Sequence, residues 1–223
     1  SKGNLLSTTD PVGNTSYYTY EGAFNKLATY KNRNGNINSY SYDNKGNLTQ
    51  VAFPLGINNS YSYNANGDLS STTDGNGNAT TYDYDNYGNV IAIHQPLGVN
   101  ILLAYDAKSR LTSYTDPRGN VTLVSYDVLD RMTSVTDPAG NAFVMTYDAK
   151  GNLLTMKDRK NNTTSLGYDA LDRVILITNA LNQNTSVTYD ARSNVLSVTD
   201  ANGNVNKSTY DHLNRLLTSM NGN

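Results

Sequence analysis

Hydrophobic and polar residues alternate along short segments of this chain, and turn-forming residues separate the segments every 10 or 11 residues. The segments are rich in Val, Ile, Thr and Tyr, which favour β-strands. Alternation with a period of two, bounded by Gly, Pro, Asn and Asp, is typical of strands joined by tight turns. The pattern therefore predicts an all-β chain of roughly twenty strands, each of roughly 6 residues.

A tyrosine recurs at a nearly constant interval through the sequence. After a first interval of 22 residues, every interval is 21, and the next residue is Asp in eight of ten cases. Glu21 and Asn64 take the place of Asp in the other two repeats. A 21-residue period that contains two turns predicts one β-hairpin per repeat, and thus an array of about ten tandem hairpins. We name these residues the anchor tyrosines: Tyr20, Tyr42, Tyr63, Tyr84, Tyr105, Tyr126, Tyr147, Tyr168, Tyr189 and Tyr210.

Seven residues before each anchor tyrosine lies a residue that accepts a positive φ. Asn161 and Asn182 hold this position in two repeats. The run Asp137-Pro138-Ala139-Gly140 shows a complete turn, in which Asp begins the turn, Pro presets φ and Gly closes it. We therefore expect a left-handed backbone at all ten positions. The eight glycines are Gly13, Gly35, Gly56, Gly77, Gly98, Gly119, Gly140 and Gly203.

A second turn follows each Tyr-Asp pair, as in the run from Asp43 to Gly46. Its fourth position is Gly, Ser, Asp or Asn in nine repeats. Phe24 is the exception and falls in the 22-residue interval, so we expect the extra residue to lie in that turn. The apolar residues after the turn are three apart, as in Leu48 and Val51, whereas strict alternation would put them on opposite faces. Either a β-bulge or a first aliphatic side chain folded under the turn would explain this spacing.

The strand before each anchor tyrosine alternates between large and small side chains. Period two places the large residues on one face of the sheet and the small polar ones on the other. Stacked repeats would then form a ladder of tyrosines, each buried ring contributing roughly 1.5–3 kcal/mol. Each phenol oxygen would need a hydrogen-bond partner or water. The large residues two positions before the anchors include Tyr18, Tyr40, Tyr61, Tyr82, Leu103, Val124, Met145, Leu166 and Val187.

Composition and charge remove several classes of function. The net charge is −2 and the basic residues are scattered, which disfavours nucleic acid as a partner. No apolar run approaches the ~18 residues of a membrane-spanning helix, and no cysteine is present. His94 and His212 lie in different repeats, which disfavours a transition-metal site. Turn formation explains the regular carboxylates, with weak surface calcium binding as the alternative. We found no catalytic motif and expect neither an enzyme nor a cofactor.

The repeat resembles the RHS/YD repeat of bacterial RHS proteins, Tc toxin shells and teneurins. The resemblance rests on Gly46-Asn47-Leu48, Thr136-Asp137-Pro138-Ala139-Gly140-Asn141 and Thr146-Tyr147-Asp148. It covers residues 1–223 as a single YD-repeat array with partial units at both ends, and we expect the array to be a segment of a longer repeat region. The resemblance implies a continuous, curved or spiralling antiparallel sheet in a secreted or cell-surface bacterial protein. In toxin complexes such a sheet forms a hollow shell around a toxic domain, and the related teneurin shell serves adhesion.

Two functional interpretations follow. The first is a structural scaffold, part of a β-shell that encapsulates or presents a toxin or another polypeptide. The second is an extracellular adhesin or filament-forming subunit that binds partner proteins or glycans. In both, other repeats or neighbouring subunits would pair with the open sheet edges. A ligand face, if present, is expected at Tyr18, Tyr40, Tyr61 and Tyr82, although packing between repeats also explains these rings.

Overall fold

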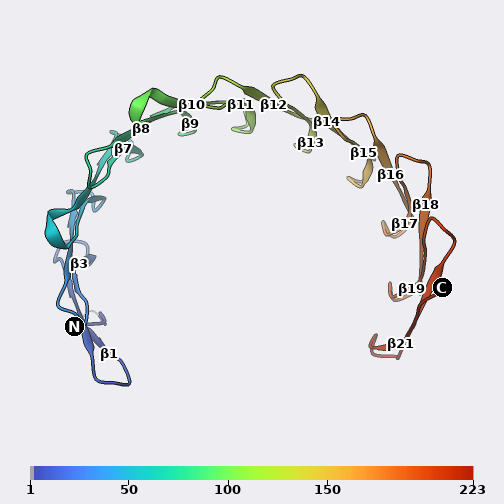
Figure 1. Cartoon of the computed structure of the whole chain (residues 1–223), viewed down its shortest axis with the longest axis horizontal. Coiled ribbons are helices and arrows are strands. Elements are labelled where there is room, and N and C mark those ends of the chain that lie inside the picture. The colour runs from blue at the N-terminus through green and yellow to red at the C-terminus, as the bar shows by residue number, and fades with distance from the viewer. Residues whose placement is uncertain (1–2, 223) are drawn as a thin grey trace. The chain divides into compact units, whose positions relative to one another are not determined.

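The computed structural model describes residues 3–222 and consists of antiparallel strands and tight turns (Figure 1). Its 21 described strands confirm the all-β prediction. The chain divides into two compact units between Asn120 and Val121. Within each unit, every strand pairs with the strand that follows it in the sequence.

The first unit contains eleven strands and two short 3-10 turns. These are β1 (Ser7–Thr9), β2 (Thr15–Tyr20), β3 (Leu27–Lys31), β4 (Ile37–Tyr42), β5 (Leu48–Ala52), η1 (Pro54–Gly56), β6 (Asn58–Tyr63), β7 (Leu69–Thr73), β8 (Ala79–Tyr84), β9 (Val90–Gln95), η2 (Pro96–Gly98), β10 (Val99–Tyr105) and β11 (Leu111–Thr115).

The second unit contains ten strands. These are β12 (Val121–Tyr126), β13 (Met132–Thr136), β14 (Ala142–Tyr147), β15 (Leu153–Lys157), β16 (Thr163–Tyr168), β17 (Val174–Thr178), β18 (Asn184–Tyr189), β19 (Val195–Thr199), β20 (Val205–Tyr210) and β21 (Leu216–Met220).

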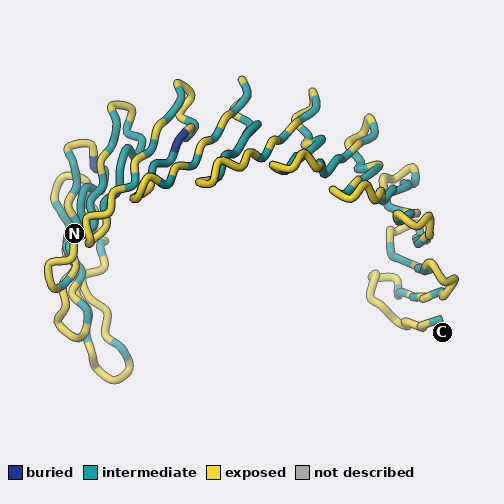
Figure 2. The backbone as a smooth tube through the Cα atoms, turned by 45° about the horizontal axis from the view of Figure 1, so that its top comes forward, coloured by how far each residue is buried: buried dark blue, intermediate teal, exposed yellow. Residues whose placement is uncertain are grey.

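Each unit is a single sheet, and among the elements that the structure describes none forms a second layer within that unit (Figure 1). Val51 and Ala92 are the only buried hydrophobic residues in the part of the chain that the structure describes, and both lie in the first unit (Figure 2). Ordinary domains bury one face of a sheet against another layer. The anchor tyrosines are therefore half-buried between neighbouring side chains.

Most turns of both kinds share one backbone geometry. In the turn from Asp43 to Asn47, the N–H of Gly46 donates to the Asp43 carbonyl and the N–H of Asp43 donates to the Asn47 carbonyl. The fourth residue has a positive φ, which describes a type I turn followed by a one-residue bulge. We call the turns after the Tyr-Asp pairs the Tyr-Asp turns, and those that join one hairpin to the next the connecting turns. The left-handed backbone that we expected before the anchors is present at all ten positions.

The first Tyr-Asp turn is one residue longer than the others. The N–H of Glu21 donates to the carbonyl of Lys26, five residues on, where the regular turns span four. This confirms that the extra residue of the 22-residue interval lies in the turn. The longer turn lets the ring of Phe24 pack on Gly46 of the next hairpin, where a Cβ atom would lie only 3.1 Å from the ring.

The connecting turns at η1 and η2 depart from the common geometry. Leu55 and Leu97 have φ values of 68° and 65°, a left-handed conformation that costs a leucine about 1 kcal/mol. The other connecting turns begin with Asp or Asn, whereas Phe53 and Gln95 begin these two. In the turn that contains Pro117, the Asp116 carboxylate accepts two backbone N–H groups, and only the glycine of that turn has a positive φ. Without such a carboxylate, Pro-Leu-Gly adopts a type II-like turn.

A β-bulge follows each Tyr-Asp turn and explains the three-residue spacing of apolar positions. In the hairpin of β4 and β5, Tyr40 lies opposite Val51 and Tyr42 lies opposite Leu48, so that Thr49 is the extra residue. Ten hairpins show the same shift of register. Of the two explanations that the sequence left open, the structure adopts the bulge.

The anchor phenols join one hairpin to the next. The backbone ladder between β5 and β6 ends at the pair Gln50–Ser60, two residues short of Leu48. The hydroxyl of Tyr63 on β6 then donates to the Leu48 carbonyl at 2.9 Å. The same bond to the residue fifteen positions earlier, at 2.8–3.0 Å, is made by anchors that include Tyr20, Tyr42, Tyr63, Tyr84, Tyr147, Tyr168 and Tyr189.

The carboxylates of the Tyr-Asp turns act within their own turns. In the turn that begins at Asp106, one carboxylate oxygen accepts the backbone N–H groups of Lys108 and Arg110 at 2.9 and 3.1 Å. The other accepts the Nε–H of Arg110 at 2.7 Å. The Arg110 side chain, followed by these backbone donors, lowers the pKa of Asp106 from 3.8 to about 2. Where Asn replaces Arg, as at Asn47, the side-chain amide makes the equivalent bond to Asp43.

Replacing Tyr63 with Phe should lower the free energy of unfolding by about 1 kcal/mol, because the Leu48 carbonyl loses its donor. The matched control is Tyr61→Phe, since the Tyr61 hydroxyl has no hydrogen bond in the described chain. Urea unfolding followed by circular dichroism measures both. Equal effects of the two substitutions would contradict a structural role for the anchor phenol.

The Asp106 carboxyl should titrate near pH 2 in carboxyl-resolved NMR, and Arg110→Gln should raise its pKa. A pKa that is lower in the folded than in the unfolded chain contributes stability above pH 3.8, which is lost as the pH falls toward 2. Acid unfolding of the Arg110→Gln variant should therefore begin at a higher pH than that of the parent chain. An Asp106 titration that does not respond to the substitution would rule out the arginine as the cause.

Candidate functional site

The register of the hairpins separates two faces of very different chemistry. In the hairpin of β4 and β5, Tyr40, Tyr42, Leu48 and Val51 lie on one face, which we call the tyrosine face. The opposite face, which we call the hydroxyl face, carries mainly Ser, Thr and other small residues. Hydroxyls pair across strands on it, as between Thr146 and Thr155 at 2.6 Å and between Thr188 and Ser197 at 2.7 Å. The predicted separation of large from small polar residues is therefore present.

The tyrosine face of the first unit carries two kinds of tyrosine. The anchor hydroxyls are engaged with neighbouring carbonyls, and partial burial, followed by nearby charge, raises the pKa of Tyr42 and Tyr63. The residues two positions earlier differ. The hydroxyls of Tyr40, Tyr61 and Tyr82 make no hydrogen bond within residues 3–222. We call these three residues the free-phenol row.

Tyr18, the fourth residue of the expected ligand face, is partly engaged. Its hydroxyl lies 3.4 Å from that of Thr8, and its ring centroid is 5.3 Å from that of Tyr30. Two shallow clefts of about 590 and 550 Å³ open along this part of the face. Tyr18 and Tyr20 line the first cleft, and Tyr40 and Tyr42 line the second. Paired tyrosines therefore border open space in the first unit.

Arginines of the Tyr-Asp turns cover anchor tyrosines in the second unit. The guanidinium carbons of Arg131 and Arg173 lie 4.6 Å from the ring centroids of Tyr147 and Tyr189. Arg131 also donates to the Asp148 carbonyl of the next turn at 2.9 Å. This stacking joins neighbouring hairpins and was missed from the sequence. Its only sequence signal is an Arg at the fifth position of the turn, where four other repeats have Asn and one has Asp.

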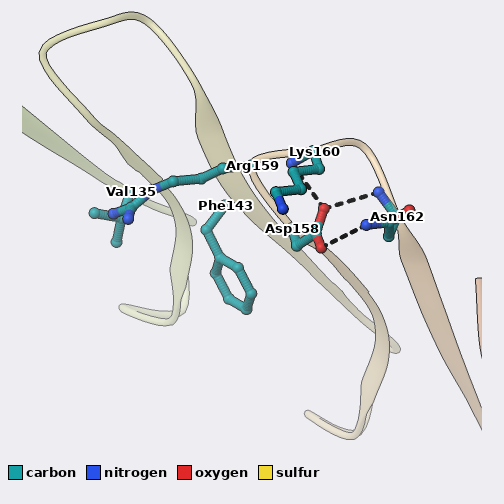
Figure 3. Close-up of a pocket in the computed structure, with 6 residues that line it drawn as sticks. All are labelled: Val135, Phe143, Asp158, Arg159, Lys160 and Asn162. Atoms are coloured by element: carbon teal, nitrogen blue, oxygen red, sulfur yellow. Dashed lines mark hydrogen bonds between the residues drawn. The ribbon is translucent and has the colours of Figure 1, made fainter.

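A charged cleft of the second unit, with a volume of about 600 Å³, lies between β13, β14 and the connecting turn that begins at Asp158 (Figure 3). Val135 and Phe143 supply apolar side chains from β13 and β14. The turn that begins at Asp158 supplies Arg159 and Lys160. Sequence reasoning did not single out these residues, because each is ordinary in its own strand or turn and only the fold brings them together.

The remaining titratable residues are scattered within residues 3–222. No group of three or more His, Cys, Asp or Glu side chains is close enough to hold a metal ion in the described part of the chain. His94 lies on the hydroxyl face, where its ring nitrogens lie 3.0 Å from Asp83 and 2.9 Å from Asn100. The Asp83 carboxylate, followed by Asn100, raises the pKa of His94. Among residues 3–222, no helix has the length and apolarity needed to cross a membrane.

Solved structures share this fold over nearly the whole chain. The crystal structure of TcdB2-TccC3 matches 97% of the chain with a TM-score of 0.63 at 18% identity. The Photorhabdus luminescens Tc holotoxin pore with a mutated TccC3 matches 97% with a TM-score of 0.63 at 19% identity. This chain spans only 14% and 13% of the length of those chains. No curated protein matches it.

The RHS Repeat family model matches residues 63–99, 105–142, 147–183, 170–205 and 189–222. These segments cover more than half of the chain and contain the hairpins with the anchor tyrosines, the bulges and the carboxylate-bound turns. The resemblance of the Tyr-Asp motifs to RHS/YD repeats is thereby confirmed. The chain belongs to the RHS Repeat family.

Proposed function

We propose that this chain is part of a β-shell that encloses or presents another polypeptide. Family and fold support a structural repeat scaffold. The proposal that the sheet encloses or presents a polypeptide rests on the uncovered single sheet, in which half-buried aromatic and aliphatic side chains fill one face. A sheet of this kind has two large faces free to contact something other than its own core.

The strand edges fit a scaffold that continues into further repeats. Among the described strands, β1 pairs only with β2, and β21 pairs only with β20. An unpaired edge is a ready template for another strand. We propose that further repeats or a neighbouring subunit pair with these edges, and that the protein acts outside the bacterial cytoplasm, as secreted or surface-bound.

Protease protection in the full-length protein that contains this array tests the shell. Proteinase K should leave intact an enclosed segment whose sequence does not belong to the repeat array. Mass spectrometry identifies the protected segment. Replacing Tyr42, Tyr63 and Tyr84 together with Phe should expose that polypeptide, because three inter-hairpin bonds are lost. The matched control replaces Tyr40, Tyr61 and Tyr82 with Phe and should retain protection. Complete digestion, in the parent protein, of every segment that does not belong to the array would refute enclosure.

A second candidate function is glycan binding by a surface adhesin, and the free-phenol row favours it. The fold accepts Val124, Met145 and Leu166 at the equivalent positions, so it does not require tyrosine there. Tyrosine combines a flat apolar ring with a polar hydroxyl, which suits stacking against a sugar. No charged residue occupies the tyrosine-face positions of the hairpins from β4 to β7.

On a glycan array, the parent chain should bind neutral oligosaccharides. A Tyr40→Leu, Tyr61→Leu, Tyr82→Leu variant should lose this binding, because the rings are gone while an aliphatic side chain that the fold accepts remains. A control with Ser60→Ala and Ser62→Ala on the hydroxyl face should bind as the parent does. Unchanged glycan binding by the triple leucine variant would place any adhesin activity elsewhere.

A further inference from the structure

The charged cleft of the second unit has an apolar floor that the fold does not require. Val135 and Phe143 are cross-strand partners on the tyrosine face. Phe143 lies four residues before its anchor, where the other hairpins of this unit have Thr122, Thr164, Thr185 and Asn206. The scaffold therefore tolerates a small polar residue at this position. The phenylalanine adds an apolar surface, half-exposed, that faces the cleft.

The wall of the cleft carries two adjacent cations. Arg159 and Lys160 occupy the middle of the connecting turn, where the neighbouring turns of the unit have Pro138-Ala139 and Ala180-Leu181. The concentration of positive charge is local, because the chain as a whole has a net charge of −2.

The carboxylates beside the cleft are already engaged. Asp158 accepts the backbone N–H groups of Lys160 and Asn162 and the side-chain amide of Asn162, each at 2.8 Å (Figure 3). Asp137 lies 3.6 Å from Arg159 and binds its own turn. Lys160, in contrast, has no ion pair within the described residues. An incoming anion can therefore meet the Lys160 ammonium without displacing a protein carboxylate.

We propose that this cleft binds an acidic polypeptide segment in which an aspartate or glutamate stands beside a bulky apolar side chain. The carboxylate pairs with Lys160 and reaches the edge of the Arg159 guanidinium, and the apolar side chain covers Phe143 and Val135. A volume of about 600 Å³ accommodates one large side chain and its neighbours. The inference rests on the proposed function, because the segment belongs to the polypeptide that the scaffold encloses or presents.

Fluorescence anisotropy with the complete 223-residue chain tests the proposal without the parent protein. The probe is a fluorescein-labelled Glu-Phe-Asp-Leu-Gly peptide, compared with Lys-Phe-Lys-Leu-Gly and Glu-Ser-Asp-Ser-Gly. Only the first should bind, and its affinity should fall as the salt concentration rises. Equal binding of the three peptides, or binding of phenylacetate as tight as that of the first peptide, would overturn the assignment to an acidic polypeptide.

Two pairs of variants locate the site. Lys160→Glu should weaken binding about tenfold. Arg118→Glu makes the same charge change at the equivalent position of another connecting turn and should leave binding unchanged. Phe143→Thr should weaken binding about tenfold through lost apolar contact, whereas Ile101→Thr at the equivalent position of β10 should not. Unchanged binding in both cleft variants would refute this site, while protease protection in the parent protein would still decide the shell.

Discussion

The hydrogen bond from the anchor phenols to the bulge carbonyls is the interaction on which the array depends. A bulge after each Tyr-Asp turn ends the backbone ladder between neighbouring hairpins early, as at Gln50 and Ser60. The Leu48 carbonyl beyond that point would need another donor, and the Tyr63 phenol of the next hairpin supplies it. The tyrosine thus supplies a donor to a carbonyl that the bulge leaves without a ladder partner. Because the donor and the acceptor lie fifteen residues apart, this contact can form only when consecutive hairpins keep the same register.

Stability in this protein arises at two separate levels. Within a turn, an aspartate such as Asp106 binds its own backbone and the fifth residue, so each corner is set locally. Between hairpins, phenol hydrogen bonds, stacked arginines such as Arg131 and side-chain packing on the tyrosine face couple one repeat to the next. A single sheet has no central core to share, so the coupling is between neighbours. Loss of one anchor should therefore weaken the contact of two hairpins and leave distant repeats intact.

The sequence predicted this fold well because its main determinants are local and periodic. The spacing of Tyr42 and Tyr63 and the glycines before them specify hairpins without any knowledge of long-range contacts. The spacing of Leu48 and Val51 left two explanations open, a β-bulge or an aliphatic side chain folded under the turn. The choice between them depended on the partner strand. The carbonyl partner of the phenol could not be predicted, since it follows from where a ladder ends. The left-handed backbone of Leu55 could not be predicted either. It follows from the absence of a carboxylate at Phe53, where most other connecting turns have Asp.

The cleft beside Phe143 lies beyond sequence reasoning for a different reason. Repeats are recognised by the residues that they share, whereas a binding site in a repeat protein arises where one unit differs from the others. Phe143 replaces a small polar residue, and Arg159 and Lys160 replace small or apolar ones, in two hairpins that the fold places together. The free-phenol row is a departure of the same kind, confined to the first unit. The invariant residues of the array thus build the scaffold, and its exceptions are where contacts with other molecules should be sought.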